Sequence, residues 1–212
     1  MYAGVPTDHA EAVHRVRSSH LAAVALVFVC AVPPTALAGS ARDIRKVAWR
    51  EVAVPGAICG AKEPIRLHNG RAVVASSRWR AVPRVTVTAG WNPLVYGNLD
   101  GIGQDEAALV VGCSNGGGTA SAYLAFAQVI FAVKGRALRV VGVVVPQQRQ
   151  RPNTLPTLLT VRIARGKVIA HEAWYGPKDG TCCPSGRTTT VWRYVRGTLR
   201  AGAPRVTRLP SG

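Results

Sequence analysis

Short runs of alternating apolar and polar residues recur along the chain from residue 65 onward. Residues 84–91, RVTVTAGW, alternate with a period of two, which is typical of a strand with one buried face. In residues 65–75, IRLHNGRAVVA, Asn69-Gly70 separates two β-prone runs, and this pair is a strong hairpin signal. Further β-prone runs occupy residues 107–113, 123–133, 136–146, 158–176 and 188–202. The pattern therefore predicts a series of short antiparallel strands.

Turns of a basic residue followed by glycine separate several of these runs. Lys134-Gly135, Arg165-Gly166 and Arg196-Gly197 follow one another at equal intervals along the chain. Glycine tolerates the positive φ of tight turns, so this regular spacing predicts successive hairpins in a β-meander.

Residues 120–133 fit two interpretations. Leu124, Ala127, Gln128 and Phe131 could share one face of a helix. Val129, Ile130 and Val133 favour a strand, and Gly135 ends the run in a turn. We predict a strand.

Composition indicates one mainly β domain. The chain has 212 residues, 48% of them apolar, and its 22 Gly and 14 Pro favour turns over long helices. Residues 39–54 read as a polar lead-in with one amphipathic stretch, and residues 146–156 as a polar loop. We expect residues 39–212 to form a single antiparallel domain, a meander or sandwich or a set of propeller-blade-like hairpins, stapled by disulfides.

Residues 1–38 have the layout of a secretory signal peptide. An apolar run spans residues 21–31, Arg15 and Arg17 precede it, and Ala36-Leu37-Ala38 supplies a cleavage pattern. A membrane anchor is the alternative, but spanning a bilayer takes about 20 apolar residues. We therefore expect cleavage after Ala38, a secreted or envelope-associated protein, and no stable transmembrane segment after processing.

Four cysteines remain in the expected mature chain: Cys59, Cys113, Cys182 and Cys183. An even number in an exported protein predicts disulfides, with three possible connectivities. A bond between the adjacent cysteines would close a strained ring, so we favour one bridge from each to Cys59 and Cys113. A four-cysteine zinc site is the alternative, but its usual pairs of closely spaced cysteines are absent.

The chain is strongly basic, with 27 Lys plus Arg against 10 Asp plus Glu and a net charge of +17. The basic residues are scattered without a run of five, which argues against a nucleic-acid-binding tail. For an exported protein, such a charge predicts an anionic cell-wall polymer, a glycan or lipid headgroups as partner. Genome composition together with solubility is an equally good explanation of the charge.

An acidic, glycine-rich segment at residues 98–106 has the spacing of a calcium loop. Asn98, Asp100 and Glu106 stand at positions 1, 3 and 9, and Gln104 could add a carbonyl at position 7. Ile102 offers no ligand at position 5. The alternative is a tight turn that has kept its shape without a metal.

Residues 96–107 read YGNLDGIGQDEA, residues 113–120 read CSNGGGTA, and residues 174–192 read WYGPKDGTCCPSGRTTTVW. On these motifs, the stretch 96–192 resembles a group of uncharacterised exported actinobacterial proteins. The group's core has the form YGDLDGDGxDEA, then a Cys followed by NGGGTA, then WYGPxDxxCCPSGRxTTVW. The matching stretches here are residues 96–107, 113–120 and 174–192. The acidic loop is also similar to the calcium loop of FG-GAP/VCBS-type repeats, although Asn98 and Ile102 depart from both patterns. The resemblance implies the shape of the loop more than its metal, and it implies no activity.

Two further segments could carry function. Residues 112–116 match the G-x-S-x-G nucleophile elbow, with Ser114 as the nucleophile of a small secreted hydrolase. His68 and His171 are the histidines of the mature chain, and neither stands in the order that this fold requires.

In the segment from 174 to 187, Trp174 and Tyr175 could stack on a sugar, and Asp179 and Arg187 could grip hydroxyls or a carboxylate. A disulfide-pinned loop with packed aromatic rings is the structural alternative.

Together these features predict a non-enzymatic, exported binding or structural module of the cell envelope or extracellular space. A calcium-stabilised adhesive module and a serine hydrolase using Ser114 are the alternatives. Calcium is the one cofactor that the sequence suggests.

Overall fold

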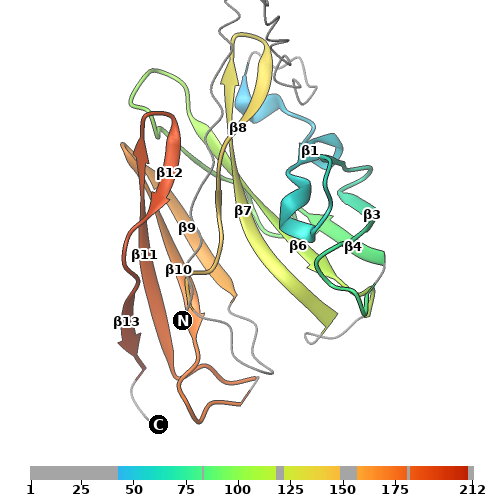
Figure 1. Cartoon of the computed structure of the whole chain (residues 1–212). Coiled ribbons are helices and arrows are strands. Elements are labelled where there is room, and N and C mark those ends of the chain that lie inside the picture. Colours follow the sequence, from blue (N-terminus) through green and yellow to red (C-terminus); the bar gives the residue numbers. More distant parts are fainter. Residues whose placement is uncertain (1–42, 83, 118–121, 149–156, 181, 210–212) are drawn as a thin grey trace, which may run out of the picture. The chain divides into compact units, whose positions relative to one another are not determined.

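The computed structural model describes residues 43–82, 84–117, 122–148, 157–180 and 182–209, and within them antiparallel strands predominate (Figure 1). The expected signal peptide and most of the polar loop at 146–156 lie outside the described residues. A six-stranded sheet has the order β3-β4-β6-β7-β8, and β5 also pairs with β6. Its strands are β3 (Arg71–Ala75), β4 (Arg84–Ala89), β5 (Val95–Gly97), β6 (Glu106–Ser114), β7 (Tyr123–Lys134) and β8 (Ala137–Val144). The mainly β prediction is confirmed, and the strand prediction made for residues 120–133 is confirmed for residues 123–133.

The C-terminal part of the chain forms a second sheet of five strands. Its order is β12-β11-β10-β9, and β13 also pairs with β11. These strands are β9 (Leu158–Ala164), β10 (Lys167–Trp174), β11 (Gly186–Val195), β12 (Thr198–Ala201) and β13 (Arg205–Arg208).

The N-terminal segment covers one face of the six-stranded sheet. It contains the short helical turns η1 (Ile44–Lys46), η2 (Trp49–Glu51) and η3 (Gly56–Cys59), and a small sheet of β1 (Ala53–Val54) and β2 (Ile65–Arg66). Ile44, Val52 and Val54 are buried in one core cluster with side chains of β4, β6 and β7. The described part of the predicted polar lead-in, residues 43–54, therefore packs as a layer, because these apolar residues face the sheet.

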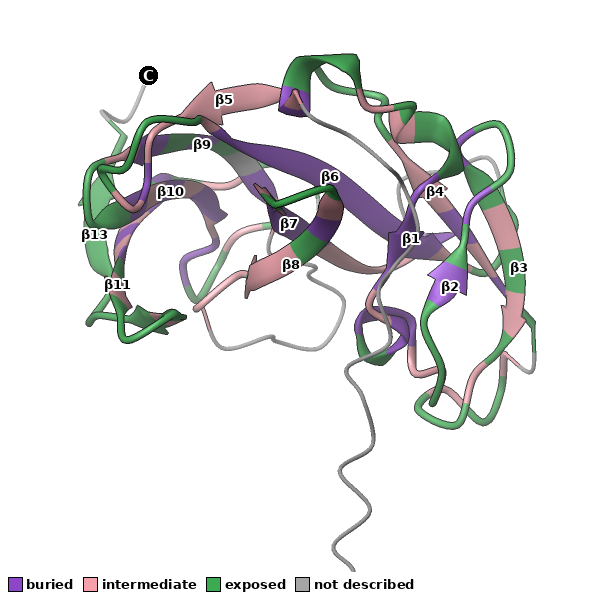
Figure 2. Ribbon diagram, turned by 90° about the horizontal axis from the view of Figure 1, so that it is seen from above, coloured by how far each residue is buried: buried purple, intermediate pink, exposed green. Residues whose placement is uncertain are grey.

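Strand β6 is buried on both faces, as Figure 2 shows. Ala107, Leu109 and Val111 pack towards the N-terminal segment, whereas Ala108 belongs to a second cluster between the two sheets. A strand covered on both faces reads as a continuous apolar run instead of an alternating one. This explains why residues 107–113 show no period of two.

Two glycines allow the sheets to approach closely. A Cβ atom on Gly97 of β5 would lie 2.6 Å from the carbonyl oxygen of Ile163 in β9. A Cβ atom on Gly142 of β8 would lie 2.5 Å from the Leu199 side chain of β12. These contacts close the second core, in which Ile130 packs with side chains from the five-stranded sheet.

The predicted turns occur where the sequence places them. Asn69 and Gly70 have φ values of 52° and 77°, and an isolated bridge between His68 and Arg71 closes that turn. Strand β2, however, pairs with β1 and not with β3. The three basic-glycine turns join β7 to β8, β9 to β10, and β11 to β12. The first lies in one sheet and the other two in the second sheet, so the predicted meander is divided between sheets.

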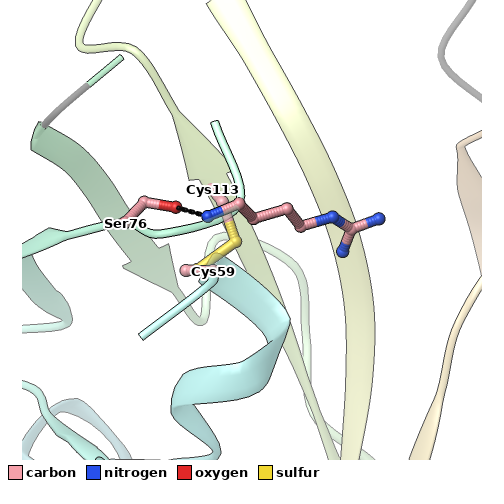
Figure 3. Close-up of a disulfide and its surroundings, with 4 residues drawn as sticks. Cys59, Ser76 and Cys113 are labelled. Atoms are coloured by element: carbon pink, nitrogen blue, oxygen red, sulfur yellow. Dashed lines mark hydrogen bonds between the residues drawn. A yellow bond between two sulfur atoms is a disulfide. The ribbon is translucent and has the colours of Figure 1, made fainter. Parts of the chain in front are cut away.

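The disulfide connectivity differs from the one favoured above. Cys59 pairs with Cys113, with their Cα atoms 5.5 Å apart (Figure 3). Cys182 pairs with its neighbour Cys183. The prediction that the C-terminal pair reaches back to the front of the domain is wrong. The fold explains this: Cys59 and Cys113 meet in the core beneath the N-terminal segment, whereas the other two cysteines lie in the loop between β10 and β11.

No helix among the described residues is long and apolar enough to span a membrane.

Candidate functional site

The outer face of the five-stranded sheet gathers basic residues that are scattered in the sequence. In β11, Thr188, Thr190 and Trp192 are buried, so the residues between them point away from the core. The antiparallel register places the outward positions of the neighbouring strands beside these residues. We call the exposed set the basic face: Arg162, Lys167, Arg187, Arg193, Arg200 and Arg205.

Three of these cations form a row across adjacent strands. Lys167 is in register with Arg193, and Arg193 is in register with Arg200. Neighbouring strands lie about 4.8 Å apart, and like charges directly opposite one another destabilise a sheet. The ion pairs found among the described residues involve none of the basic face. The row is therefore a concentration of unneutralised positive charge.

The one acidic residue in these five strands points the other way. Glu172 of β10 is fully buried and accepts hydrogen bonds from the backbone N–H groups of Gln147 (2.9 and 3.0 Å) and Gln148 (3.2 Å). The hydroxyl of Thr190 donates a further bond of 3.2 Å. Glu172 thus anchors the segment that follows β8 and leaves the basic face without a carboxylate.

The acidic loop at 98–106 is held by its own hydrogen bonds. Asn98 accepts from the N–H of Gly101, and Asp100 accepts from the N–H of Ile102 at 2.9 Å. Glu106 is buried and accepts from the N–H of Leu99 at 2.6 Å. The turn shape that the sequence predicts therefore needs no metal to satisfy these oxygens.

Lysine and arginine side chains neutralise two further carboxylate oxygens of this loop. Lys134 Nζ donates to Asp100 Oδ2 at 2.8 Å, and Arg45 donates to Asp105 at 2.7 Å. The hydrogen bond from Lys134 lowers the pKa of Asp100, and the same bond raises the pKa of Lys134. Burial raises the pKa of Glu106.

These contacts do not favour a calcium site. The Asp100 carboxylate is engaged by an ammonium group, and Ile102 is 78% exposed and brings no oxygen side chain. Gln104 lies in the exposed part of the loop, and its N–H donates to the carbonyl of Ile102. Within the described part of the chain, no three His, Cys, Asp or Glu residues gather closely enough to hold a metal. Calcium binding stays a prediction, and the Lys134 ion pair does not favour it.

The second predicted binding segment, which includes Tyr175 and Asp179, is held by its own packing and hydrogen bonds. Tyr175 is only 7% exposed, and Asp179 accepts hydrogen bonds from the backbone N–H groups of Gly176 and Ser185. Trp174 is half-buried, and a Cβ atom on Gly186 would lie 2.8 Å from its ring.

Arginines flank this loop. Arg208 lies over the Trp174 ring at 5.9 Å, and Arg187 is exposed on β11. Of the four residues predicted to bind a ligand, Tyr175 and Asp179 thus hold the loop, while Arg187 belongs to the basic face. A ligand role for the four stays a prediction.

Ser114 does not have the surroundings of a nucleophile elbow. The nucleophile of an elbow stands on the sharp turn after a strand, but Ser114 is still part of β6 and is paired with Tyr123 of β7. Its hydroxyl accepts from the N–H of Gly116 at 3.4 Å. His68 contacts Glu51 and His171 contacts Thr189, and neither is hydrogen-bonded to Ser114 within the described structure.

The basic residues are scattered along the sequence, and the basic face was therefore not predicted from it. The sequence does carry a local sign of this face, because basic residues occupy outward positions of an alternating strand. Arg187 and Arg193, on either side of Thr189 and Val191, are an example. Strand pairing, which the sequence does not specify, then brings Lys167 and Arg200 alongside. Comparison with known proteins adds nothing to this geometry: no family model, no curated protein and no solved structure matches the chain.

Proposed function

We propose that this protein is a non-enzymatic binding module of the cell envelope or extracellular space, whose basic face binds an anionic polymer of the cell wall or an anionic glycan. The observation that carries the proposal is the row formed by Lys167, Arg193 and Arg200, three exposed cations in register on adjacent strands. The signal-peptide pattern at residues 1–38 supports the location.

A polymer suits this surface better than a small anion. The basic face extends over five strands, and the main pockets of the described structure are lined by other residues. A single anion would therefore gain little from one exposed contact. A chain with repeated negative groups can engage several of the cations at once, and the local effective concentration of each further group is then high. The expected interaction is multivalent and weakened by salt.

The direct test is retention on an anionic polysaccharide, with dextran sulfate and alginate as the probes. Replacing Lys167, Arg193 and Arg200 by Gln should weaken binding at least about tenfold at physiological salt, since several exposed ion pairs of up to about 1 kcal/mol each are lost.

The matched control replaces Arg71, Arg84 and Arg139 by Gln. These residues are also exposed but belong to the six-stranded sheet, so the net charge changes equally. Their loss should weaken binding far less. Equal weakening in both triple variants would mean that net charge alone acts, and the assignment to the basic face would be wrong.

A further inference from the structure

A pocket of about 410 Å³ lies between η3 and the ends of β7 and β8 that approach it. Its walls are apolar: Ile58 comes from η3, Leu124 and Phe126 from β7, and Val143 from β8. Phe126 continues the apolar surface outward, because it stacks on Tyr123 at 4.8 Å and meets the edge of Trp91 at 6.2 Å. Trp91 is 40% exposed. A pocket of this size and lining suits an apolar chain or ring.

One charged side chain borders this pocket among its described lining residues, namely Arg78. Arg78 is exposed, and its guanidinium lies 5.1 Å from the Trp79 ring centroid. It forms no ion pair with any described residue. A guanidinium offers five N–H donors, a geometry that matches carboxylate and phosphate oxygens. The mouth of the pocket is thus ready for an anionic group.

The backbone on both sides of the pocket is held in place. The N–H and the hydroxyl of Ser77 both donate to the carbonyl of Gly60 at 3.0 Å, directly after the Cys59–Cys113 bridge. The hydroxyl of Ser76 accepts from the N–H of Arg78 at 3.2 Å (Figure 3). The segment that carries Arg78 is therefore attached to the disulfide-linked turn.

The opposite wall is fixed through Gln148. Its side-chain amide donates to the carbonyl of Tyr175 at 2.9 Å, and its oxygen accepts from the Tyr175 N–H at 3.2 Å. With both walls fixed, ligand binding needs little ordering of the protein, which favours affinity.

We propose that this pocket binds an anionic amphiphile, with one saturated chain against Ile58, Phe126 and Val143 and a carboxylate or phosphate on Arg78. The apolar lining selects the chain, and charge complementarity selects the head group. This site is independent of the basic face, so failure of polymer binding would leave it standing.

The test is calorimetric titration with hexanoate, octanoate and decanoate below their micelle-forming concentrations, with decanol as the uncharged probe. Each additional buried methylene should tighten binding about fourfold. Titration with octyl phosphate then shows whether the site prefers a phosphate or a carboxylate head group. If neither the carboxylates nor octyl phosphate bind the folded protein, the proposal is wrong.

Three variants locate the site. Arg78→Gln should weaken decanoate binding about tenfold or more and leave decanol binding unchanged, because only the head group loses its partner. Arg80→Gln removes a nearby exposed charge outside the pocket lining and should change neither. Ala57→Trp should abolish binding of both probes, because Ala57 is an exposed residue of the pocket wall and a larger side chain would fill the space. A thermal melt of each variant verifies folding. Equal decanoate affinity of wild type and Arg78→Gln would overturn the head-group assignment.

Discussion

The charged side chains of the acidic loop at 98–106 have partners within the molecule, whereas those of the basic face have none among the described residues. In the loop, Asp100 is paired with Lys134, Asp105 is paired with Arg45, and Glu106 accepts a backbone N–H. On the basic face, Lys167, Arg193 and Arg200 stand in register with no acid among them. Charges that hold a turn are neutralised inside the molecule. Charges left together without a partner cost stability and are available to a ligand.

The largest loss of folding stability should come from replacing Glu172, a buried acid that accepts several hydrogen bonds within the protein. Glu172→Ala would leave the N–H groups of Gln147 and Gln148 and the Thr190 hydroxyl without their acceptor in a buried position. The free energy of unfolding should fall by about 3 kcal/mol, which corresponds to roughly 10 °C in the melting midpoint. Glu63→Ala, which removes an exposed acid, is the control and should change the midpoint little. A small effect of Glu172→Ala would refute the anchoring role.

A smaller loss is expected at the loop's ion pair. Lys134→Gln removes the cation from Asp100, whose side chain is 13% exposed, and should cost about 1 kcal/mol or less because Lys134 itself is half-exposed. The cost should show in denaturant unfolding near pH 7.

The pH dependence of this pair has a definite sign. The pKa of Asp100 is lowered and that of Lys134 is raised. The pair therefore stabilises the fold between about pH 4 and about pH 10 and loses its effect on either side. Burial raises the pKa of Glu106, so its ionisation disfavours the fold, and protonation in acid relieves that cost. Asp100→Asn should lose less stability than wild type between pH 6 and pH 3; an equal loss in both would exclude the pair as the cause.

A gain is expected where like charges meet. Arg193→Thr should raise the free energy of unfolding by about 0.5 kcal/mol at low salt, because Arg193 is the middle cation of the row. The same variant should bind dextran sulfate more weakly. Melts at low and high salt measure the effect, and the gain should shrink as salt screens the repulsion. If Arg193→Thr instead lowered the free energy of unfolding at low salt, repulsion within the row would not be the dominant effect of Arg193.

The smallest effect is expected from calcium. Melts of the wild type in millimolar calcium and in chelator should coincide, because Lys134 already engages Asp100. Lys134→Gln frees this carboxylate and tests whether the ammonium is what excludes the metal. A calcium-dependent rise in the wild-type midpoint would follow from binding to the native state. It would restore the loop as a metal site.

Local features of this fold were predictable because they depend on neighbouring residues. Asn69-Gly70 forms its turn, the basic-glycine pairs join consecutive strands, and the β-branched residues of 123–133 form β7. The shape of the acidic loop followed from its glycines, and Gly101 and Gly103 both have positive φ.

Features that depend on distant pairing were not predictable in the same way. Ring strain argues against a bond between adjacent cysteines, but the packing of η3 against β6 places Cys59 beside Cys113 and leaves Cys182 and Cys183 to pair with each other. To predict the basic face, one would need to know which residues of each strand point outward and in which register the strands pair. The pocket beside Arg78 requires contact between η3, β7 and β8, and η3 is far from the two strands in the sequence.

The two disulfides would differ in what reduction does to the molecule. The Cys59–Cys113 bond spans 54 residues, and in the chain-entropy model closing such a loop stabilises the fold by about 4 kcal/mol. The Cys182–Cys183 bond joins neighbours and restricts almost no unfolded chain. A reductant should therefore loosen the N-terminal segment first, making residues 44–67 a protease-sensitive unit, while the hairpins of the five-stranded sheet outlast it. In that sequence of events the pocket beside η3 would be lost before the basic face.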